Sequence, residues 1–60
     1  GKININRASS YKLKSLPGIG EVLSKRIINA RPFSSIHEVK DVKGIGPKTF
    51  EDIRWKITAQ

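Results

Sequence analysis

Several residue types are missing or scarce in this sequence of 60 residues. It has no cysteine, which excludes disulfides and thiolate metal sites. Its one histidine, His37, cannot hold zinc alone, so neither a metal nor a cofactor is expected. No apolar run approaches the roughly 20 residues that span a bilayer, and no signal sequence is present. Because the chain opens on Gly1 in place of Met, we expect an excised domain whose targeting segment lies upstream.

Negative charge is also scarce. The chain has 12 Lys and Arg against five Asp and Glu, which gives a net charge of +7 and a pI near 10.3. This balance predicts nucleic acid or an anionic surface as the partner. We expect the carboxylates to lie on helix surfaces in solvated ion pairs, and no residue pattern indicates a catalytic site. The protein is therefore not expected to be an enzyme. The carboxylates are Glu21, Glu38, Asp41, Glu51 and Asp52.

An internal duplication organises the chain. The stretch 16–20, Leu-Pro-Gly-Ile-Gly, returns 26 residues later at 42–46 as Val-Lys-Gly-Ile-Gly. We name these stretches hairpin 1 and hairpin 2. A chain of 60 residues is only marginally stable by itself, so we expect the two copies to pack against each other. Further matches at the same spacing are Ser9 with Ser35, Leu13 with Val39, and Ile27 with Ile53.

The glycines of each hairpin predict both a tight turn and a site that binds anions. Glycine adopts positive φ and allows close approach of another backbone or a ligand, so Gly-Ile-Gly between two helical patterns predicts a tight hairpin. Backbone N–H groups of the hairpin and of the following helical turn then point outward and form an anion site. Ile19 and Ile45 are expected to point inward and anchor the hairpins. The alternative is that the glycines merely connect helices.

The first half predicts an extended arm and two helices. Ile3 and Ile5 alternate with polar residues in the arm, and a single strand cannot form a sheet, so a β domain is not expected. Asn6 or Ser9 can cap a first helix, which ends before Pro17. Apolar residues recur with helical spacing from Glu21 to about Ala30. This second helix ends at Arg31, which precedes a proline.

The second half predicts a core bridge and two more helices. Phe33 is expected to cross between the halves. Ser35 to Glu38 has the spacing of a capping box, which predicts a short third helix. Pro47 suits the start of a last helix that places Phe50, Ile53 and Ile57 on one face. We expect Trp55, which lies off this stripe, to cover the arm or a helix end rather than to stack on bases.

These motifs together resemble a known family. They are Asn4-Ile5-Asn6, Ala8-Ser9, Leu13-x-x-Leu16-Pro17-Gly18-Ile19-Gly20, Arg26-Ile27-Ile28, Arg31-Pro32-Phe33 and Val42-Lys43-Gly44-Ile45-Gly46-Pro47-Lys48-Thr49. In this order they resemble the tandem helix-hairpin-helix domain of the ComEA family of competence proteins, over nearly the whole chain. One departure is Ser24, where the family often has Ala.

The resemblance implies an all-α fold in one domain, residues 1–60. Its first unit would span about 6–31 and its second about 33–58, related by a pseudo-twofold axis. Four to five short helices would form a compact bundle like that of SAM domains. As an isolated domain it would be a monomer.

The resemblance also implies binding of double-stranded DNA without sequence specificity. Each hairpin would grip the phosphates of one strand across the minor groove through backbone amides, and nearby cations would add charge. The site residues are Gly18, Ile19, Gly20, Lys25, Arg26, Lys43, Gly44, Ile45, Gly46, Lys48 and Thr49.

The implied biological role is that of a DNA receptor for transformation. Such a receptor would stand at the extracytoplasmic face of a bacterial membrane, which it would touch only through a segment absent from this chain. Two alternatives stay open. The domain could be the DNA-holding appendage of a cytoplasmic repair enzyme, or a protein-interaction module. The strong positive charge argues against the second.

Overall fold

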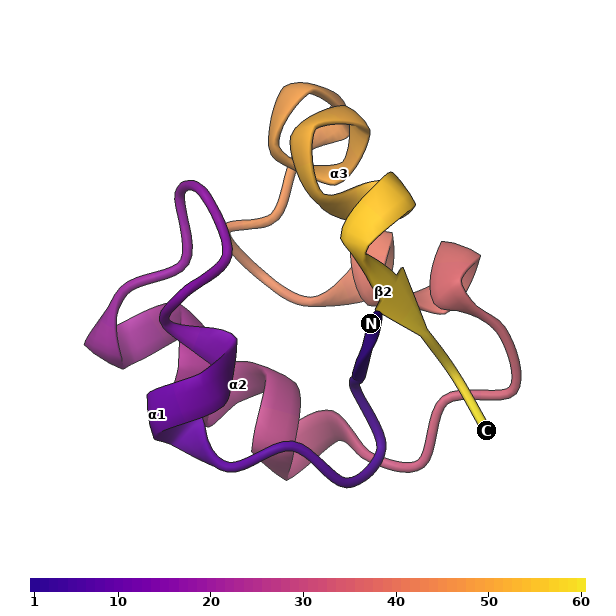
Figure 1. Ribbon diagram of the computed structural model, residues 1–60. Coiled ribbons are helices and arrows are strands. Elements are labelled where there is room, and N and C mark those ends of the chain that lie inside the picture. Colours follow the sequence, from indigo (N-terminus) through magenta and orange to yellow (C-terminus); the bar gives the residue numbers. More distant parts are fainter.

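Local signals in the sequence determine where most of the helices begin and end. The computed structural model describes every residue from 1 to 60 (Figure 1). The elements in chain order are β1 (Ile3–Asn4), α1 (Ser10–Leu13), α2 (Glu21–Ala30), the 3-10 helix η1 (Ile36–Asp41), α3 (Pro47–Ile53), the 3-10 helix η2 (Arg54–Lys56) and β2 (Ile57–Thr58). The fold is mainly helical and measures 22 × 21 × 20 Å. None of its helices combines the length and the apolar character that a membrane span needs.

The predicted start of the first helix and both ends of the second are confirmed. The first helix is shorter than expected, because α1 ends at Leu13 and does not include Leu16. Ser9 caps α1, because its Oγ accepts a hydrogen bond from the Lys12 amide at 3.2 Å. Asn6 does not cap this helix. The second helix begins at Glu21, directly after the N-cap residue Gly20, and ends at Ala30 before Arg31. Pro47 stands in the first turn of α3, as predicted.

The predicted capping box at Ser35 is wrong. In a capping box the Ser35 hydroxyl would accept from the Glu38 amide. That amide instead donates to the Ser35 carbonyl oxygen at 3.2 Å, which is the i to i+3 bond of a 3-10 turn. The Glu38 carboxylate accepts from the Ser34 amide at 2.9 Å. The third helix is therefore η1, with tighter winding than an α-helix.

A core of 12 apolar residues lies between the two halves. Residues matched by the repeat are buried to the same degree: Leu13 and Val39 are both fully buried, as are Ile27 and Ile53. Phe33 is 6% exposed, which confirms it as a core residue. The other members are Ile5, Leu16, Ile19, Val42, Ile45, Phe50 and Ile57. The repeat therefore describes the packing as well as the sequence.

Ser24 is the one buried polar residue. At the repeat spacing it matches Phe50, which is also buried, so the first unit has a small side chain where the second has a large one. The Ser24 hydroxyl donates to the Glu21 carbonyl oxygen at 2.9 Å. Because this bond satisfies the hydroxyl, burying it costs little.

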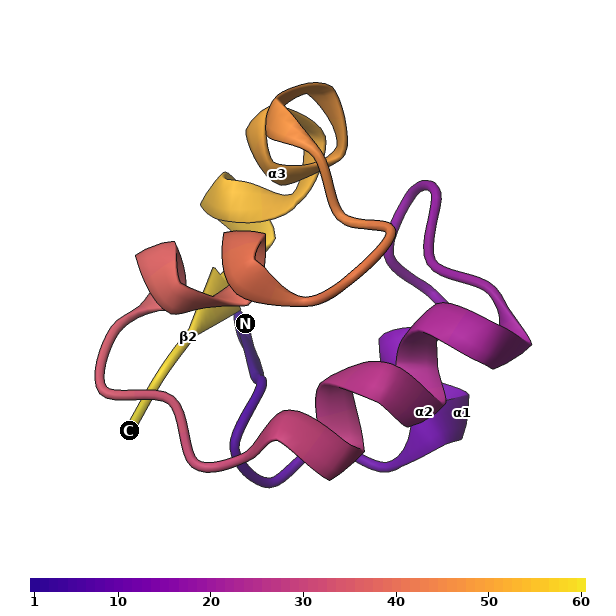
Figure 2. The same ribbon diagram turned by 180° about the vertical axis from the view of Figure 1, so that it is seen from behind.

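The all-α prediction needs one correction, because the two ends of the chain form a small parallel sheet. Strand β1 pairs with β2 in the register Ile3 with Ile57 and Asn4 with Thr58. The Ile5 amide extends the pairing to the Thr58 carbonyl oxygen at 2.9 Å. Both views show the start of the chain beside β2 (Figures 1 and 2). The backbone groups of the arm need partners, and the end of the chain supplies them.

The same sheet corrects the prediction for the last helix. Phe50 and Ile53 are buried on α3, but the helix ends at Ile53 and gives way to η2. Ile57 is buried as predicted, yet it lies on strand β2. Trp55 is 70% exposed, so the expectation that it covers the arm or a helix end is wrong.

Asn6 joins the arm to the middle of the chain. Its side-chain Oδ1 accepts from the Phe33 amide at 2.7 Å, and its Nδ2 donates to the Phe33 carbonyl oxygen at 2.9 Å. The Arg31 side chain makes a second connection, since its Nε donates to the Ile5 carbonyl oxygen at 2.6 Å and its Nη2 donates to that of Ala8. These bonds hold the arm against the segment between α2 and η1.

We predict that Asn6→Ala lowers the free energy of unfolding by about 1–3 kcal/mol. The substitution leaves both polar groups of the partly buried Phe33 backbone without their partner. Urea denaturation measures the change. Asn29→Ala is the matched control, because Asn29 is exposed on α2 and its side chain makes no hydrogen bond within the chain. Equal stability of the two variants would contradict the role of Asn6.

Candidate nucleic-acid interface

The two hairpins share one backbone conformation, as the repeat predicts. Gly18 and Gly44 have positive φ, at 79° and 99°. The Ile19 amide donates to the Leu16 carbonyl oxygen at 3.1 Å, and the Ile45 amide makes the equivalent bond to Val42 at 3.0 Å. Both isoleucine side chains are buried and anchor their hairpins, as expected. Their amides are already used inside the hairpins, so neither isoleucine amide is free to bind a ligand.

Four glycine amides lack an acceptor within the chain. They belong to Gly18 and Gly20 in hairpin 1 and to Gly44 and Gly46 in hairpin 2, and all four residues are exposed. Backbone N–H groups of this kind are suited to bind phosphate oxygens. The hairpins therefore offer two equivalent sets of donors.

The second glycine of each hairpin is not required by the fold. Gly20 and Gly46 have φ of −104° and −92°, in the extended region that any residue adopts. A Cβ added at either position would meet no atom within 4 Å. Both residues are helix N-caps, where Ser, Asp or Asn would cap the helix with a side chain. Their lack of a side chain keeps the neighbouring amides accessible from outside.

The two hairpins lie side by side and make reciprocal contacts. A Cβ on Gly18 would lie 3.6 Å from Cγ2 of Thr49, in the first turn of α3. A Cβ on Gly44 would lie 2.6 Å from Cδ2 of Leu23, in the first turn of α2. Thr49 and Leu23 are themselves equivalent in the repeat. Each hairpin thus packs on the first helical turn of the other unit, and both ribbon views show the loops next to each other (Figures 1 and 2).

The predicted cations differ in how free they are. Arg26 donates from Nη1 to the Lys43 carbonyl oxygen at 2.9 Å, which ties α2 to hairpin 2. Lys48 has a side chain that is 92% exposed and lies 3.6 Å from Asp52. Lys43 is exposed and makes no ion pair, so it is free to bind an anion.

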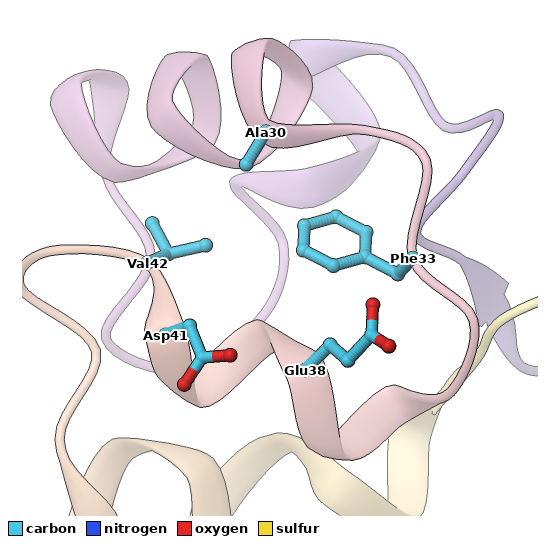
Figure 3. A pocket seen from close by; sticks show the side chains of 5 residues that line it. All are labelled: Ala30, Phe33, Glu38, Asp41 and Val42. Atoms are coloured by element: carbon cyan, nitrogen blue, oxygen red, sulfur yellow. The ribbon is translucent and has the colours of Figure 1, made fainter.

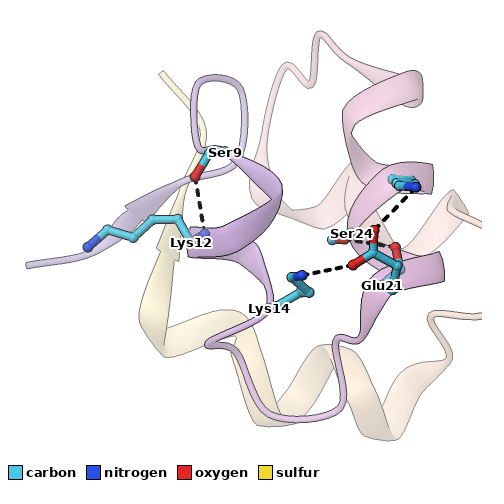
Figure 4. Close-up of polar contacts among 6 residues, drawn as sticks. Ser9, Lys12, Lys14, Glu21 and Ser24 are labelled. Atoms are coloured by element: carbon cyan, nitrogen blue, oxygen red, sulfur yellow. Dashed lines mark hydrogen bonds and ion pairs between the residues drawn. The ribbon is translucent and has the colours of Figure 1, made fainter.

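Glu21 brings two lysines together beside hairpin 1 (Figure 4). Its carboxylate lies 2.8 Å from Nζ of Lys14 and 3.2 Å from Nζ of Lys25. The hydrogen bond from Lys14, with help from Lys25, lowers the pKa of Glu21 below its ordinary value. Sequence reasoning included Lys25 but missed Lys14. The i, i+4 spacing pairs Glu21 with Lys25, whereas the turn at Gly18 brings Lys14 close only in three dimensions.

The hollows in the surface are not lined by the hairpin glycines. One of about 160 Å³ is lined by Ala30, Phe33, Glu38, Asp41 and Val42, with the Glu38 carboxylate on the side of Phe33 and the Asp41 carboxylate on the side of Val42 (Figure 3). Two carboxylates repel a polyanion, so this hollow does not suit nucleic acid. Surface ion pairs were predicted for all five carboxylates. They are confirmed for Glu21, Glu51 and Asp52, whereas Glu38 and Asp41 make no ion pair.

Comparison with known proteins identifies the family to which this geometry belongs. Residues 1–58 match the helix-hairpin-helix motif family. The chain is therefore a helix-hairpin-helix protein. The match covers both hairpins, β1, all the helices and β2.

Two relatives are much longer than this chain. One is a deoxyribonuclease from Thioalkalivibrio sp. (strain K90mix), which is 39% identical over 54 residues, or 90% of this chain and 15% of the relative. The other is ComE operon protein 1 from Bacillus subtilis (strain 168), which is 36% identical over 62 aligned residues, or 97% of this chain and 30% of the relative. The second match confirms the resemblance to the ComEA family.

We predict that Gly44→Ala destabilises the fold by more than about 1 kcal/mol. The positive φ of Gly44 strains any side chain, and its Cβ would overlap Leu23. Gly46→Ala is the control and should cost only about 0.5 kcal/mol, the difference between glycine and alanine as N-caps. Gly18→Ala should fall between them, because it shares the strain but not the overlap. Thermal unfolding of the three variants tests this order.

Proposed function

We propose that this chain binds double-stranded DNA without sequence specificity, by holding phosphates on its two hairpins. The observation that carries the proposal is the pair of matched hairpins, side by side, with glycine amides free on each. Backbone amides bind phosphate oxygens and carry no information about bases. The proposed contact residues are Gly18, Ile19, Gly20, Lys25, Arg26, Lys43, Gly44, Ile45, Gly46, Lys48 and Thr49, with the two isoleucines acting as anchors.

The relation between the hairpins supports binding of both strands. We propose that units 6–31 and 33–58 form one domain with a pseudo-twofold axis, in a SAM-like arrangement. The reciprocal packing of Gly18 on Thr49 and of Gly44 on Leu23 supports this axis. The local symmetry of a duplex is also twofold, so each hairpin would hold one strand on either side of the minor groove.

The glycines at positions 20 and 46 support direct contact with phosphate. The fold allows a side chain at both positions, yet the sequence has none at either. A β-branched residue there would keep a phosphate away from the amides of the first helical turn. Substitutions at these two positions can therefore remove the proposed contact with DNA without disturbing the fold.

We propose that the chain holds DNA as a monomer and does not cut it. Glu21, Glu51 and Asp52 are each paired with Lys or Arg at the surface. Carboxylates neutralised in this way are not gathered to hold a catalytic metal ion.

For the whole protein, we propose the role of a DNA receptor in uptake, at the extracytoplasmic face of a bacterial membrane. The similarity to ComE operon protein 1 supports it. The similarity to a deoxyribonuclease favours a second candidate, in which the domain holds DNA for a nuclease. The gene for the whole protein separates the two candidates, since a membrane segment indicates a receptor and a nuclease domain indicates an enzyme.

We predict that the affinity for duplex DNA falls steeply with salt. If about four phosphates are contacted, log K falls against log salt with a slope near −3.6, since each contact contributes about −0.9. Fluorescence anisotropy with two duplexes of unrelated sequence measures the slope and the specificity together. A flat salt response, or a large difference between the two sequences, would refute the proposal.

We predict that the double variant Gly20→Val, Gly46→Val keeps its fold and nearly loses duplex binding. Valine fits the extended φ at both positions and leaves the net charge at +7. Each lost set of phosphate contacts should weaken binding roughly tenfold, as expected for hydrogen bonds to a charged group. Circular dichroism and thermal unfolding check the fold.

Lys25→Ala is the matched control for charge. It removes one exposed cation and leaves the hairpin backbone intact, so it should weaken binding modestly and reduce the salt slope by at most about 0.9. If the folded double valine variant binds DNA as well as the parent, the hairpins only connect helices, and the basic helix faces must hold the DNA.

A further inference from the structure

Trp55 is a large apolar side chain that the fold leaves in solvent. It is 70% exposed, whereas Phe33 and Phe50 are buried in the core and the His37 ring packs on Phe50. Tyr11 is the other aromatic residue that is largely exposed. Trp55 lies in η2, directly after α3. Hairpin 2 directly precedes α3, so the two features lie at opposite ends of that helix. DNA binding at the hairpins therefore does not account for this exposed ring.

The ring is held in place by a cation. The Arg54 guanidinium lies 4.9 Å from the Trp55 ring centroid and 5.5 Å from that of Phe50, so it stands against both rings. Glu51 holds the same guanidinium at 3.3 Å. A guanidinium against an aromatic face is an attractive arrangement that fixes both groups. At 70% exposure the indole cannot be covered on both faces, so the face turned away from Arg54 is open.

Two further cations belong to the same part of the structure as Trp55 and Arg54. Lys56 follows Trp55 in η2 and is exposed, and Nζ of Lys40 lies 5.1 Å from the Phe50 ring centroid, on the ring that Arg54 also contacts. One cation of η1, which lies against Phe50, and two of η2, of which Arg54 lies against both rings and Lys56 is next to Trp55 in the chain, therefore belong to this part of the surface. Glu51 is the carboxylate paired within this cluster. We name Lys40, Arg54, Trp55 and Lys56 the Trp55 cluster.

We propose that the Trp55 cluster is a second nucleic-acid site, which binds unpaired bases of single-stranded DNA or of frayed duplex ends. The open indole face stacks on one base, and Lys40, Arg54 and Lys56 contact the flanking phosphates. An aromatic platform within a basic surface is how proteins bind single strands without sequence specificity. The bases of an intact duplex are stacked on one another, so the site selects unpaired bases over duplex. This function goes beyond the duplex binding proposed for the hairpins.

The chemistry of the cluster favours a base over a membrane or a protein. A surface that inserts into lipid or buries a protein interface presents several neighbouring apolar side chains. The exposed large apolar residues are Tyr11, Val22 and Trp55, and the first two belong to α1 and α2 of the other unit. A single ring flanked by cations suits one planar ligand that is attached to a polyanion.

Trp55 is the one tryptophan of the chain, so its fluorescence reports on this site alone. The wild-type protein is titrated with unlabelled oligothymidylate, whose bases do not pair, and with a relaxed, covalently closed duplex circle, which has no ends. We expect oligothymidylate to quench Trp55 and the circle to bind with little quenching. Equal quenching by both would place Trp55 on the duplex surface and overturn the proposal, as would binding of oligothymidylate without quenching.

A further titration tests the alternative that the Trp55 cluster binds a membrane surface. Vesicles with an anionic phospholipid are titrated in the same way. A blue shift with vesicles, together with no response to oligothymidylate, would identify the cluster as a membrane-surface contact and refute base binding.

Substitutions test whether stacking supplies the affinity. Trp55→Ala should weaken binding of labelled oligothymidylate roughly tenfold, the usual loss for one stacked base, and should leave binding of the duplex circle unchanged. Trp55→Phe keeps an aromatic face and should recover most of the affinity. Because Trp55 is mostly exposed, both variants should unfold thermally like the parent. Equal affinities of all three proteins for oligothymidylate would refute stacking.

The hairpin variant separates this site from the proposed function. Gly20→Val, Gly46→Val should lose the duplex circle yet keep the quenching of Trp55 by oligothymidylate. If the hairpin variant loses both responses while folded, single strands bind at the hairpins and no second site exists.

Discussion

The close approach of hairpin 2 to helix α2 is the constraint on which the rest of the structure depends. Gly44 lies so near Leu23 that a single added Cβ would overlap it, and Arg26 binds the Lys43 carbonyl oxygen across the same contact. The reciprocal contact of Gly18 with Thr49 has more room. Together these two contacts bring the hairpins side by side, so that free amides from both units can face one ligand. A wider separation would leave two independent and weak anion sites.

The four hairpin glycines differ in what the fold requires of them. Gly18 and Gly44 take positive φ and form the turns, which is a requirement of the backbone. Gly20 and Gly46 have ordinary backbone angles and open surroundings, so the fold does not require glycine at either position. Charge follows a similar division. Arg26 is used inside the molecule and Lys14 shares Glu21 with Lys25, whereas Lys43 and Lys48 reach into solvent. Net charge alone therefore overstates how many cations are free for DNA.

The two units have also diverged where the repeat permits it. Ser24 and Phe50 occupy equivalent buried positions, and the aromatic ring gives the second unit a surface on which Lys40 and Arg54 stand. The first unit has no such ring, and its cations gather at Glu21 instead. A duplicated scaffold thus carries two unlike basic surfaces, one at the hairpins and one beside Trp55. We propose that the first binds the phosphates of a duplex and that the second binds an unpaired base.

The sequence by itself determined the repeat, the two hairpins, helix α2 from Glu21 to Ala30 and most of the core, because these depend on local turn chemistry and on apolar spacing. Local patterns do not indicate that the two ends of the chain pair with each other. Only the tertiary structure decided that the arm pairs with β2, that Ile57 is buried on a strand, and that Asn6 binds the Phe33 backbone instead of capping α1. It also decided the exposure of Trp55, since burial depends on which elements pack nearby. Partners far apart in the chain leave no periodic signal, so backbone pairing and side-chain exposure were settled by the folded arrangement.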